Sequence, residues 1–118
     1  NRDRHGANIE VLRNARAHTL RIAPLFDHGL SLLYSCITEE EVRAFDVLED
    51  RRCQNFIGGY SCYENLELVK DRGNVFKNSL CLSDRYAIFD GLETILSNAR
   101  MDKIWSMIYE RYQIYENL

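Results

Sequence analysis

Two short β-type runs near the N-terminus constrain the fold of this chain more than any other feature. Residues 9–12 (IEVL) and 20–23 (LRIA) are rich in strand-forming residues, and the polar segment 13–19 between them suits a hairpin connection. Pro24 follows the second run, where its missing N–H ends sheet pairing, and Gly29 permits a sharp backbone turn. This part of the chain is therefore predicted to form one β-hairpin.

After the hairpin, the sequence changes to helical spacing. Thr38 followed by Glu41 is a capping-box pattern, which predicts the start of a first helix. The apolar stripe of this helix would contain Val42, Phe45 and Leu48. Amphipathic patterns predict three further helices, over residues 64–71, 83–98 and 101–115.

The remaining signals concern where these helices begin and end. Residues 49–61 show no period and are expected to form a loop, Gly73 suits the end of the second helix, and Ser83 suits the cap of the third. The last helix carries an apolar and aromatic stripe, for which core packing is a better interpretation than a ligand or partner surface. Its members are Met101, Ile104, Trp105, Ile108, Tyr112 and Tyr115.

Length and composition fit one soluble globular domain. A chain of 118 residues supports a single modest core, and 46% hydrophobic with 28% charged residues is typical of a folded protein. The net charge of −3 argues against nucleic acid as a direct partner. No run reaches the roughly 18 apolar residues that a membrane-spanning helix needs. We expect a mainly α domain, with a small β-hairpin at its N-terminal edge followed by about four helices.

The four cysteines show none of the close C-x-x-C spacing that zinc sites use. They are Cys36, Cys53, Cys62 and Cys81. The chain is long enough for a core that needs no disulfide bonds. We therefore expect reduced, partly buried thiols in a cytoplasmic protein.

Three polar residues flank the expected hairpin in an order that suits phosphoryl transfer. Asp3 and Asn8 precede the hairpin, five positions apart, and Asp27 follows it. Because the strands of a hairpin run out and back, residues before and after it lie side by side, so these three side chains can converge. Phosphoryl transfer needs a carboxylate that acts on the acceptor hydroxyl and oxygen ligands that hold Mg²⁺ against the phosphates. The sequence predicts such a site where the three residues meet.

Two segments around the hairpin resemble a known family. Residues 3–8 read DRHGAN and residues 23–29 read APLFDHG. They resemble the D-x-H-x-x-N loop and the P-x-[FY]-D metal motif of HipA-like serine/threonine kinases, and the 24-residue interval from Asp3 to Asp27 suits that family. Phosphatidylinositol-kinase-like enzymes share the first motif, but the Ala-Pro lead-in to the second favours the HipA-like group. The resemblance covers residues 1–34 and implies a kinase-like C-lobe.

The resemblance implies a role for each matched residue. Asp3 corresponds to the catalytic base, Asn8 to a Mg²⁺ ligand and Asp27 to the Mg²⁺ ligand that bridges the phosphates. His5 matches the histidine of the catalytic loop, which we expect to brace that loop by hydrogen bonding. The implied cofactors are Mg²⁺ and ATP.

The chain has neither the Gly-rich loop nor the strand lysine that grip ATP phosphates. We therefore expect residues 1–118 to be a single C-terminal lobe, with the site in 1–34, a helical subdomain in 35–118, and the ATP-binding N-terminal lobe of the same protein as a missing partner. The resemblance implies a protein Ser/Thr hydroxyl as acceptor and an antitoxin-type regulator as a further partner. Alone, this lobe is expected to be inactive and to bind no cofactor tightly.

Two other functions fit the same residues. The first is a catalytically silent helical interaction module with a kinase-like outline, whose aromatic last helix would be the docking surface. The second is a stand-alone metal-dependent hydrolase using Asp3 and Asp27. A zinc site at His28 is disfavoured, because no second histidine has suitable spacing.

Overall fold

The computed structural model describes residues 3–4, 6–55, 57–70 and 79–117, with only the backbone described for residues 3–4. The chain forms two compact units. Unit 1 combines residues 1–31 with residues 50–68, and unit 2 combines residues 32–49 with residues 69–118. The described part is mixed in class, because it contains four α-helices together with short strands.

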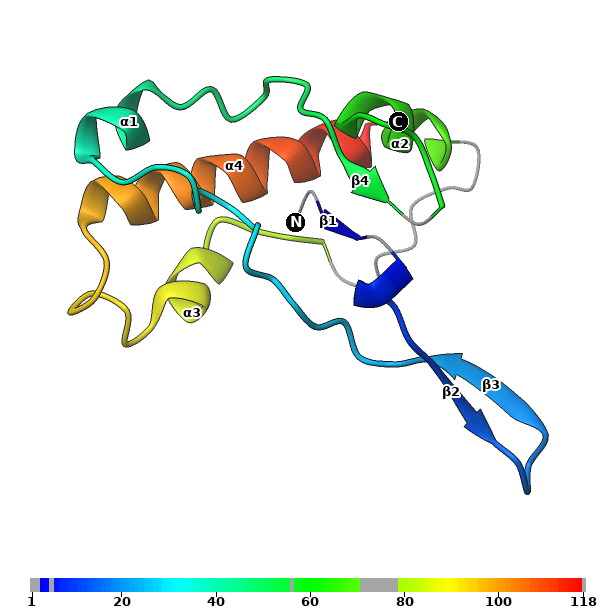
Figure 1. Ribbon diagram of the computed structural model, residues 1–118. Coiled ribbons are helices and arrows are strands. Elements are labelled where there is room, and N and C mark those ends of the chain that lie inside the picture. Colours follow the sequence, from blue (N-terminus) through cyan, green and yellow to red (C-terminus); the bar gives the residue numbers. More distant parts are fainter. Residues whose placement is uncertain (1–2, 5, 56, 71–78, 118) are drawn as a thin grey trace. The chain divides into compact units, whose positions relative to one another are not determined.

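The predicted hairpin is present in unit 1 (Figure 1). Strands β2 (Val11–Asn14) and β3 (Thr19–Ile22) pair antiparallel, with Val11 opposite Ile22 and Asn14 opposite Thr19. The first strand runs two residues further than the apolar run suggested, because Asn14 begins the turn. Its side-chain oxygen accepts hydrogen bonds from the backbone N–H groups of Arg16 and Ala17, both at 3.1 Å. This is the local bonding by which asparagine favours turns.

The expectation of a loop over residues 49–61 was wrong in part. Strand β4 (Gln54–Asn55) lies in this segment and pairs parallel with β1 (Asp3–Arg4). An isolated antiparallel bridge joins Arg52 and Ser61 in the same segment. A strand of two residues is too short to show a period, and its partner lies about fifty positions earlier in the sequence. No local sequence pattern therefore predicts this strand.

Helix α2 (Cys62–Glu67) begins two residues earlier than predicted. Ser61 is its N-cap, and the Ser61 hydroxyl accepts a hydrogen bond from the Glu64 N–H at 3.2 Å. The predicted stop at Gly73 lies outside the described residues. Unit 1 also contains η1 (Gly6–Asn8), a single 3₁₀ turn directly before the hairpin.

Helix α1 (Glu39–Ala44) of unit 2 begins with the capping box that the sequence predicted. The Thr38 hydroxyl accepts from the Glu41 N–H at 3.2 Å. The Glu41 carboxylate accepts in return from the N–H groups of Thr38 at 3.0 Å and Ile37 at 2.6 Å. These hydrogen bonds to the charged form, led by the one from Thr38, lower the pKa of Glu41 from its ordinary value.

The long third helix predicted over residues 83–98 was wrong. Helix α3 (Asp84–Phe89) stops after six residues, and Gly91 then adopts a left-handed φ of 78°. Ser83 is the N-cap residue, but its side chain makes no capping hydrogen bond. The Asp84 carboxylate instead accepts from the Cys81 N–H at 2.8 Å. Apolar residues at helical spacing therefore did not guarantee one continuous helix.

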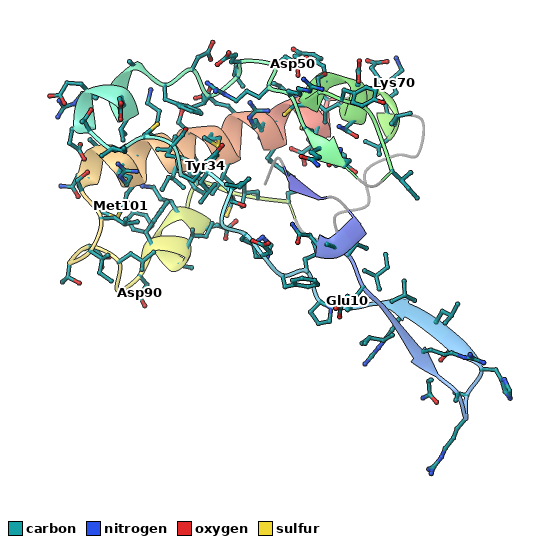
Figure 2. All side chains as sticks on the ribbon, in the orientation of Figure 1. Glu10, Tyr34, Asp50, Lys70, Asp90 and Met101 are labelled. Atoms are coloured by element: carbon teal, nitrogen blue, oxygen red, sulfur yellow. The ribbon has the colours of Figure 1, made fainter. Side chains whose placement is uncertain are left out.

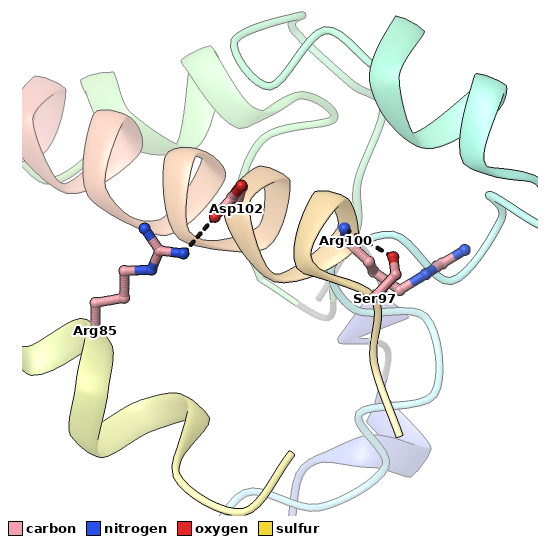
Figure 3. Close-up of polar contacts among 4 residues, drawn as sticks. All are labelled: Arg85, Ser97, Arg100 and Asp102. Carbon is pink, nitrogen blue, oxygen red and sulfur yellow. Dashed lines mark hydrogen bonds and ion pairs between the residues drawn. The ribbon is translucent and has the colours of Figure 1, made fainter. Parts of the chain in front are cut away.

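Helix α4 (Asn98–Glu116) is the fourth predicted helix, and it starts three residues earlier than expected. Ser97 caps it, accepting from the Arg100 N–H at 3.2 Å (Figure 3). The Arg85 guanidinium pairs with the Asp102 carboxylate and so ties α3 to α4 (Figure 3).

The core of unit 2 forms around α1 and α4. Its members are Leu33, Cys36, Val42, Phe89, Met101, Ile104 and Trp105. Tyr112 is also buried, and the Trp105 and Tyr109 rings stack with their centroids 5.4 Å apart. The aromatic stripe of α4 therefore packs inward over much of its length, as the core interpretation predicted.

Basic side chains of α4 also hold the segment that leads into and out of α1. Arg100 donates to the Cys36 carbonyl at 2.8 Å, and Lys103 donates to the Arg43 carbonyl at 2.9 Å. Arg111 donates to the Val47 carbonyl at 2.8 Å. The side chains of α4 thereby provide hydrogen-bond donors for backbone carbonyl groups in the irregular segments that pack on this helix. Among the described residues, no helix combines the length and apolar character that crossing a membrane requires.

Candidate functional site

Asn8 is the best-defined of the predicted site residues. It ends η1 and is only 5% exposed, although its side chain is polar. A buried amide is normally held in place by hydrogen bonds, since an unpartnered one costs about 1–3 kcal/mol. The side chain of Asn8 is therefore positioned by the fold of unit 1.

Asp27 lies in the exposed segment that follows β3. Its backbone is left-handed, with φ of 53°. Aspartate and asparagine tolerate this region better than other non-glycine residues. A hydrogen bond from the Ser31 N–H to the His28 carbonyl, at 3.0 Å, closes the turn that follows. The conformation at Asp27 is a local constraint that the sequence pattern did not indicate.

The hairpin ladder brings the chain just after Asn8 and the chain leading to Asp27 to the same end of the sheet. The Ala23 N–H donates to the Glu10 carbonyl at 2.9 Å, which extends the pairing by one step beyond Val11 and Ile22. Glu10 lies at this end of the hairpin (Figure 2), and η1 lies immediately beyond it (Figure 1). The backbone thus has the out-and-back course that the predicted convergence requires.

The other two site residues are only partly placed. The backbone of Asp3 lies in β1, opposite Gln54 of β4. The Asp3 side chain and all of His5 lie outside the described residues. The role of Asp3 as base, the bracing role of His5 and the separation of the Asn8 and Asp27 oxygens remain predictions.

His28 bears on the metal alternative. Its Nε2 atom lies 3.4 Å from the Leu25 carbonyl oxygen, which is a contact within its own loop. In the part of the chain that the structure describes, no group of three or more His, Cys, Asp and Glu residues is arranged to hold a metal ion. The side chains of Asn8 and Asp27 are candidate ligands of a different kind, because amide and carboxylate oxygens suit Mg²⁺.

The motifs and periodic patterns of the sequence did not predict the surface of the hairpin itself. All eight residues of β2 and β3 are exposed. Val11, Leu20 and Ile22 share one face by the observed register and are 60%, 69% and 68% exposed.

Arginines lie on both faces and at the tip of the hairpin. Arg13 pairs with Leu20 and so shares the face of Val11 and Ile22, whereas Arg21 pairs with Leu12 on the other face. Arg16 lies in the turn. An open depression of about 490 Å³ there is lined by Leu12, Arg13, Asn14, Ala15, Arg16, Thr19 and Arg21. The segment 11–22 contains three arginines and no acidic residue, in a chain whose net charge is −3. Counting charge segment by segment, instead of over the whole chain, would have revealed this basic hairpin.

Comparison with family models, with curated proteins and with solved structures gave no match to this chain.

Proposed function

We propose that this chain is the magnesium-handling part of the C-terminal lobe of a HipA-like serine/threonine kinase. The observation that supports it best is the position of the two motifs relative to the hairpin. The D-x-H-x-x-N sequence ends in the buried Asn8 before β2, and the P-x-F-D sequence ends in Asp27 after β3. The hairpin between them gives the chain the return course that convergence needs.

In this proposal, Asn8, Asp27 and Asp3 have different roles in phosphoryl transfer. Asn8 and Asp27 would hold Mg²⁺, which when bound offsets negative charge on the phosphates. Asp3 would orient the acceptor hydroxyl and accept its proton. Asn8 suits a ligand role because the fold fixes its side chain before any metal arrives, which lowers the ordering cost of binding.

The exposed apolar face of the hairpin supports a partner for this lobe. Val11, Leu20 and Ile22 form a group of exposed apolar side chains on the face that also carries Arg13. We propose that the nucleotide-binding lobe of the same protein covers this face and supplies the adenine and phosphate clamps. The protein substrate and an antitoxin-type regulator belong to the same proposal, as does a cytoplasmic location.

The silent interaction module receives less support. Its docking surface was to be the aromatic face of α4, but Trp105 and Tyr112 are buried in unit 2. A partner that docked there would have to displace the core.

Metal binding is tested on the chain itself with Mn²⁺, which takes the same oxygen ligands as Mg²⁺ and broadens nearby NMR signals. We expect Mn²⁺ to broaden the amide signals of Asn8 and Asp27 together, and Mg²⁺ to reverse this. Asp27→Asn should remove the effect at both residues, while Asp90→Asn, which changes an exposed carboxylate in unit 2, should leave it unchanged. Broadening at only one of the two residues would refute a shared ion.

Phosphoryl transfer is tested on the full-length gene product that contains these residues. Asp27→Asn is expected to weaken MgATP binding and turnover together, because it removes a metal ligand. Asp3→Asn is expected to lower turnover while MgATP affinity stays within a few-fold, the pattern of an interaction made in the transition state. Calorimetric titration separates the two. Loss of nucleotide affinity in Asp3→Asn, with wild-type behaviour in Asp27→Asn, would overturn the assignment.

A further inference from the structure

Two cysteines of unit 1 lie close together across a short antiparallel contact. Arg52 and Ser61 form its central bridge. The Cys53 N–H donates to the Tyr60 carbonyl at 2.7 Å, and the Cys62 N–H donates to the Arg51 carbonyl at 3.1 Å. In this register Cys53 and Cys62 are diagonal neighbours whose side chains leave the same face.

The two sulfur atoms are near bonding range. Their Sγ atoms lie 3.6 Å apart, neither is in a disulfide bond, and both residues are half-buried. A disulfide bond needs about 2.05 Å. The Sγ atoms would have to approach by about 1.5 Å to form the bond.

Asn65 of α2 holds the loop that connects the two cysteines. The Asn65 side chain accepts from the Gly59 N–H at 3.0 Å and donates to the Ser61 carbonyl at 2.6 Å. Gly58 takes a φ of 137°, which an L side chain rarely adopts. The native fold therefore keeps the two thiols close to each other.

We propose that Cys53 and Cys62 form a dithiol modification site, which a small-molecule disulfide such as oxidised glutathione converts into an intramolecular disulfide bond. One cysteine thiolate attacks the small disulfide, forms a mixed disulfide and releases one small thiol. The second cysteine thiolate attacks the protein sulfur of that mixed disulfide and releases the second small thiol. Two electrons pass from the protein to the oxidant, and the two cysteine protons end on the two released thiols.

The modification would act on a strand next to the candidate site. Cys53 directly precedes β4, and β4 pairs with β1, the strand that contains Asp3. A covalent link at Cys53 restrains the strand that supports the start of the catalytic loop. The formation of the bond needs only the two thiols and is independent of the proposed kinase function; its effect on phosphoryl transfer rests on that function.

The sequence provides a direct assay. Trypsin cleavage after Arg52 and Lys70 gives a single peptide, residues 53–70, that contains both cysteines. The reduced chain is equilibrated with oxidised and reduced glutathione under native conditions, alkylated and digested. We expect the peptide to lose both alkylations together and to be lighter by two hydrogens than its reduced form. A peptide that stays doubly alkylated across the glutathione series contradicts the proposal.

Two comparisons test whether the folded structure, and not merely the short separation of the two cysteines in the sequence, promotes the disulfide bond. At one fixed glutathione ratio, the oxidised fraction relative to the reduced fraction should be about tenfold higher in buffer than in concentrated urea, because folding holds the thiols together. Equal ratios would overturn the proposal without requiring any variant. Cys53→Ser should trap Cys62 as a mixed disulfide with glutathione, whereas Cys81→Ser should leave disulfide formation unchanged.

Discussion

At the scale of single residues, Asp27 combines a chemical role with a backbone constraint. Its φ of 53° is tolerated by aspartate, asparagine and glycine but is costly for β-branched residues. Removing the carboxylate by an arbitrary substitution would therefore mix two effects. Asparagine is the replacement that removes the charge and keeps the conformation.

This reasoning predicts different outcomes for two substitutions at Asp27. Asp27→Val should destabilise unit 1 by about 1–2 kcal/mol, because a β-branched side chain clashes in the left-handed region. Asp27→Asn should change stability by less than about 0.5 kcal/mol. Urea unfolding followed by the amide signals of unit 1 measures both. Equal destabilisation by the two variants would show that the carboxylate, and not the backbone, determines stability at this position.

At the scale of helices and strands, the capping box of α1 makes the stability of unit 2 depend on pH. The pKa of Glu41 is lower in the folded chain than its ordinary value, owing first to the hydrogen bond from Thr38. A group with a lowered folded pKa stabilises the fold above its unfolded pKa, and this contribution disappears as pH falls through the folded pKa. The effect therefore belongs to acid conditions, below about the ordinary value of 4.5.

Glu41→Gln is expected to flatten that acid dependence. Glutamine can still accept the capping hydrogen bonds but does not titrate. Trp105, the single tryptophan, lies in the core of unit 2, so its fluorescence reports unfolding of this unit. The wild-type chain should lose more stability than Glu41→Gln between pH 6 and pH 3, a window around the ordinary glutamate pKa. Glu93→Gln is the matched control. If Glu93→Gln flattened the dependence of stability on pH as much as Glu41→Gln does, the capping box would not be its cause.

Gly91 lies just after the end of α3, and its backbone conformation affects the stability of unit 2. Its φ of 78° ends α3, and an added Cβ atom would meet no other atom within 4 Å. Gly91→Ala should therefore cost about 1 kcal/mol, through backbone strain alone. Gly91→Asn should cost less, since asparagine tolerates the left-handed region. Tryptophan fluorescence in urea measures both, and a neutral alanine variant would mean that α3 can extend through this position.

These elements also show what local sequence can predict. The capping box of Thr38 and Glu41 and the apolar stripe of α4 are both local patterns, each formed by residues close together in the sequence, and both predictions were correct. The single long helix over residues 83–98 was wrong because Ile88 and Ile95 fit a helical period yet are 41% and 76% exposed. Gly91 and the capping pattern at Ser97 were the available signals of a break.

The candidate site was predictable in part for the same reason. Asn8 and Asp27 could be selected because their motifs flank a hairpin that local patterns predict. The pairing of β1 with β4 joins segments that are far apart in the sequence, so no local pattern predicts it. The burial of Asn8 and the left-handed backbone of Asp27 have no periodic pattern in the sequence either. The proximity of Cys53 and Cys62 was not predicted either, because the short bridge that aligns them lies in a segment without a periodic pattern.

At the scale of the whole molecule, both faces of the hairpin are exposed along β2 and β3. Leu20 and Ile22 lie on the apolar face, and Arg16 lies at the turn. In the chain alone, both faces are in water, so a polar substitution removes no packing. In the proposed full-length kinase, the apolar face would be covered by the nucleotide-binding lobe.

This difference gives the last prediction, for the double variant Leu20→Ser with Ile22→Ser. In the isolated chain it should change the stability of unit 1 by less than about 1 kcal/mol, because both side chains are already exposed. In the full-length protein it should lower MgATP affinity at least tenfold, since burying two polar side chains costs well over the 1.4 kcal/mol that this factor represents. Calorimetric titration of MgATP measures it, with Arg16→Ser as the control. Unchanged nucleotide affinity in the double variant would mean that the nucleotide-binding lobe lies elsewhere.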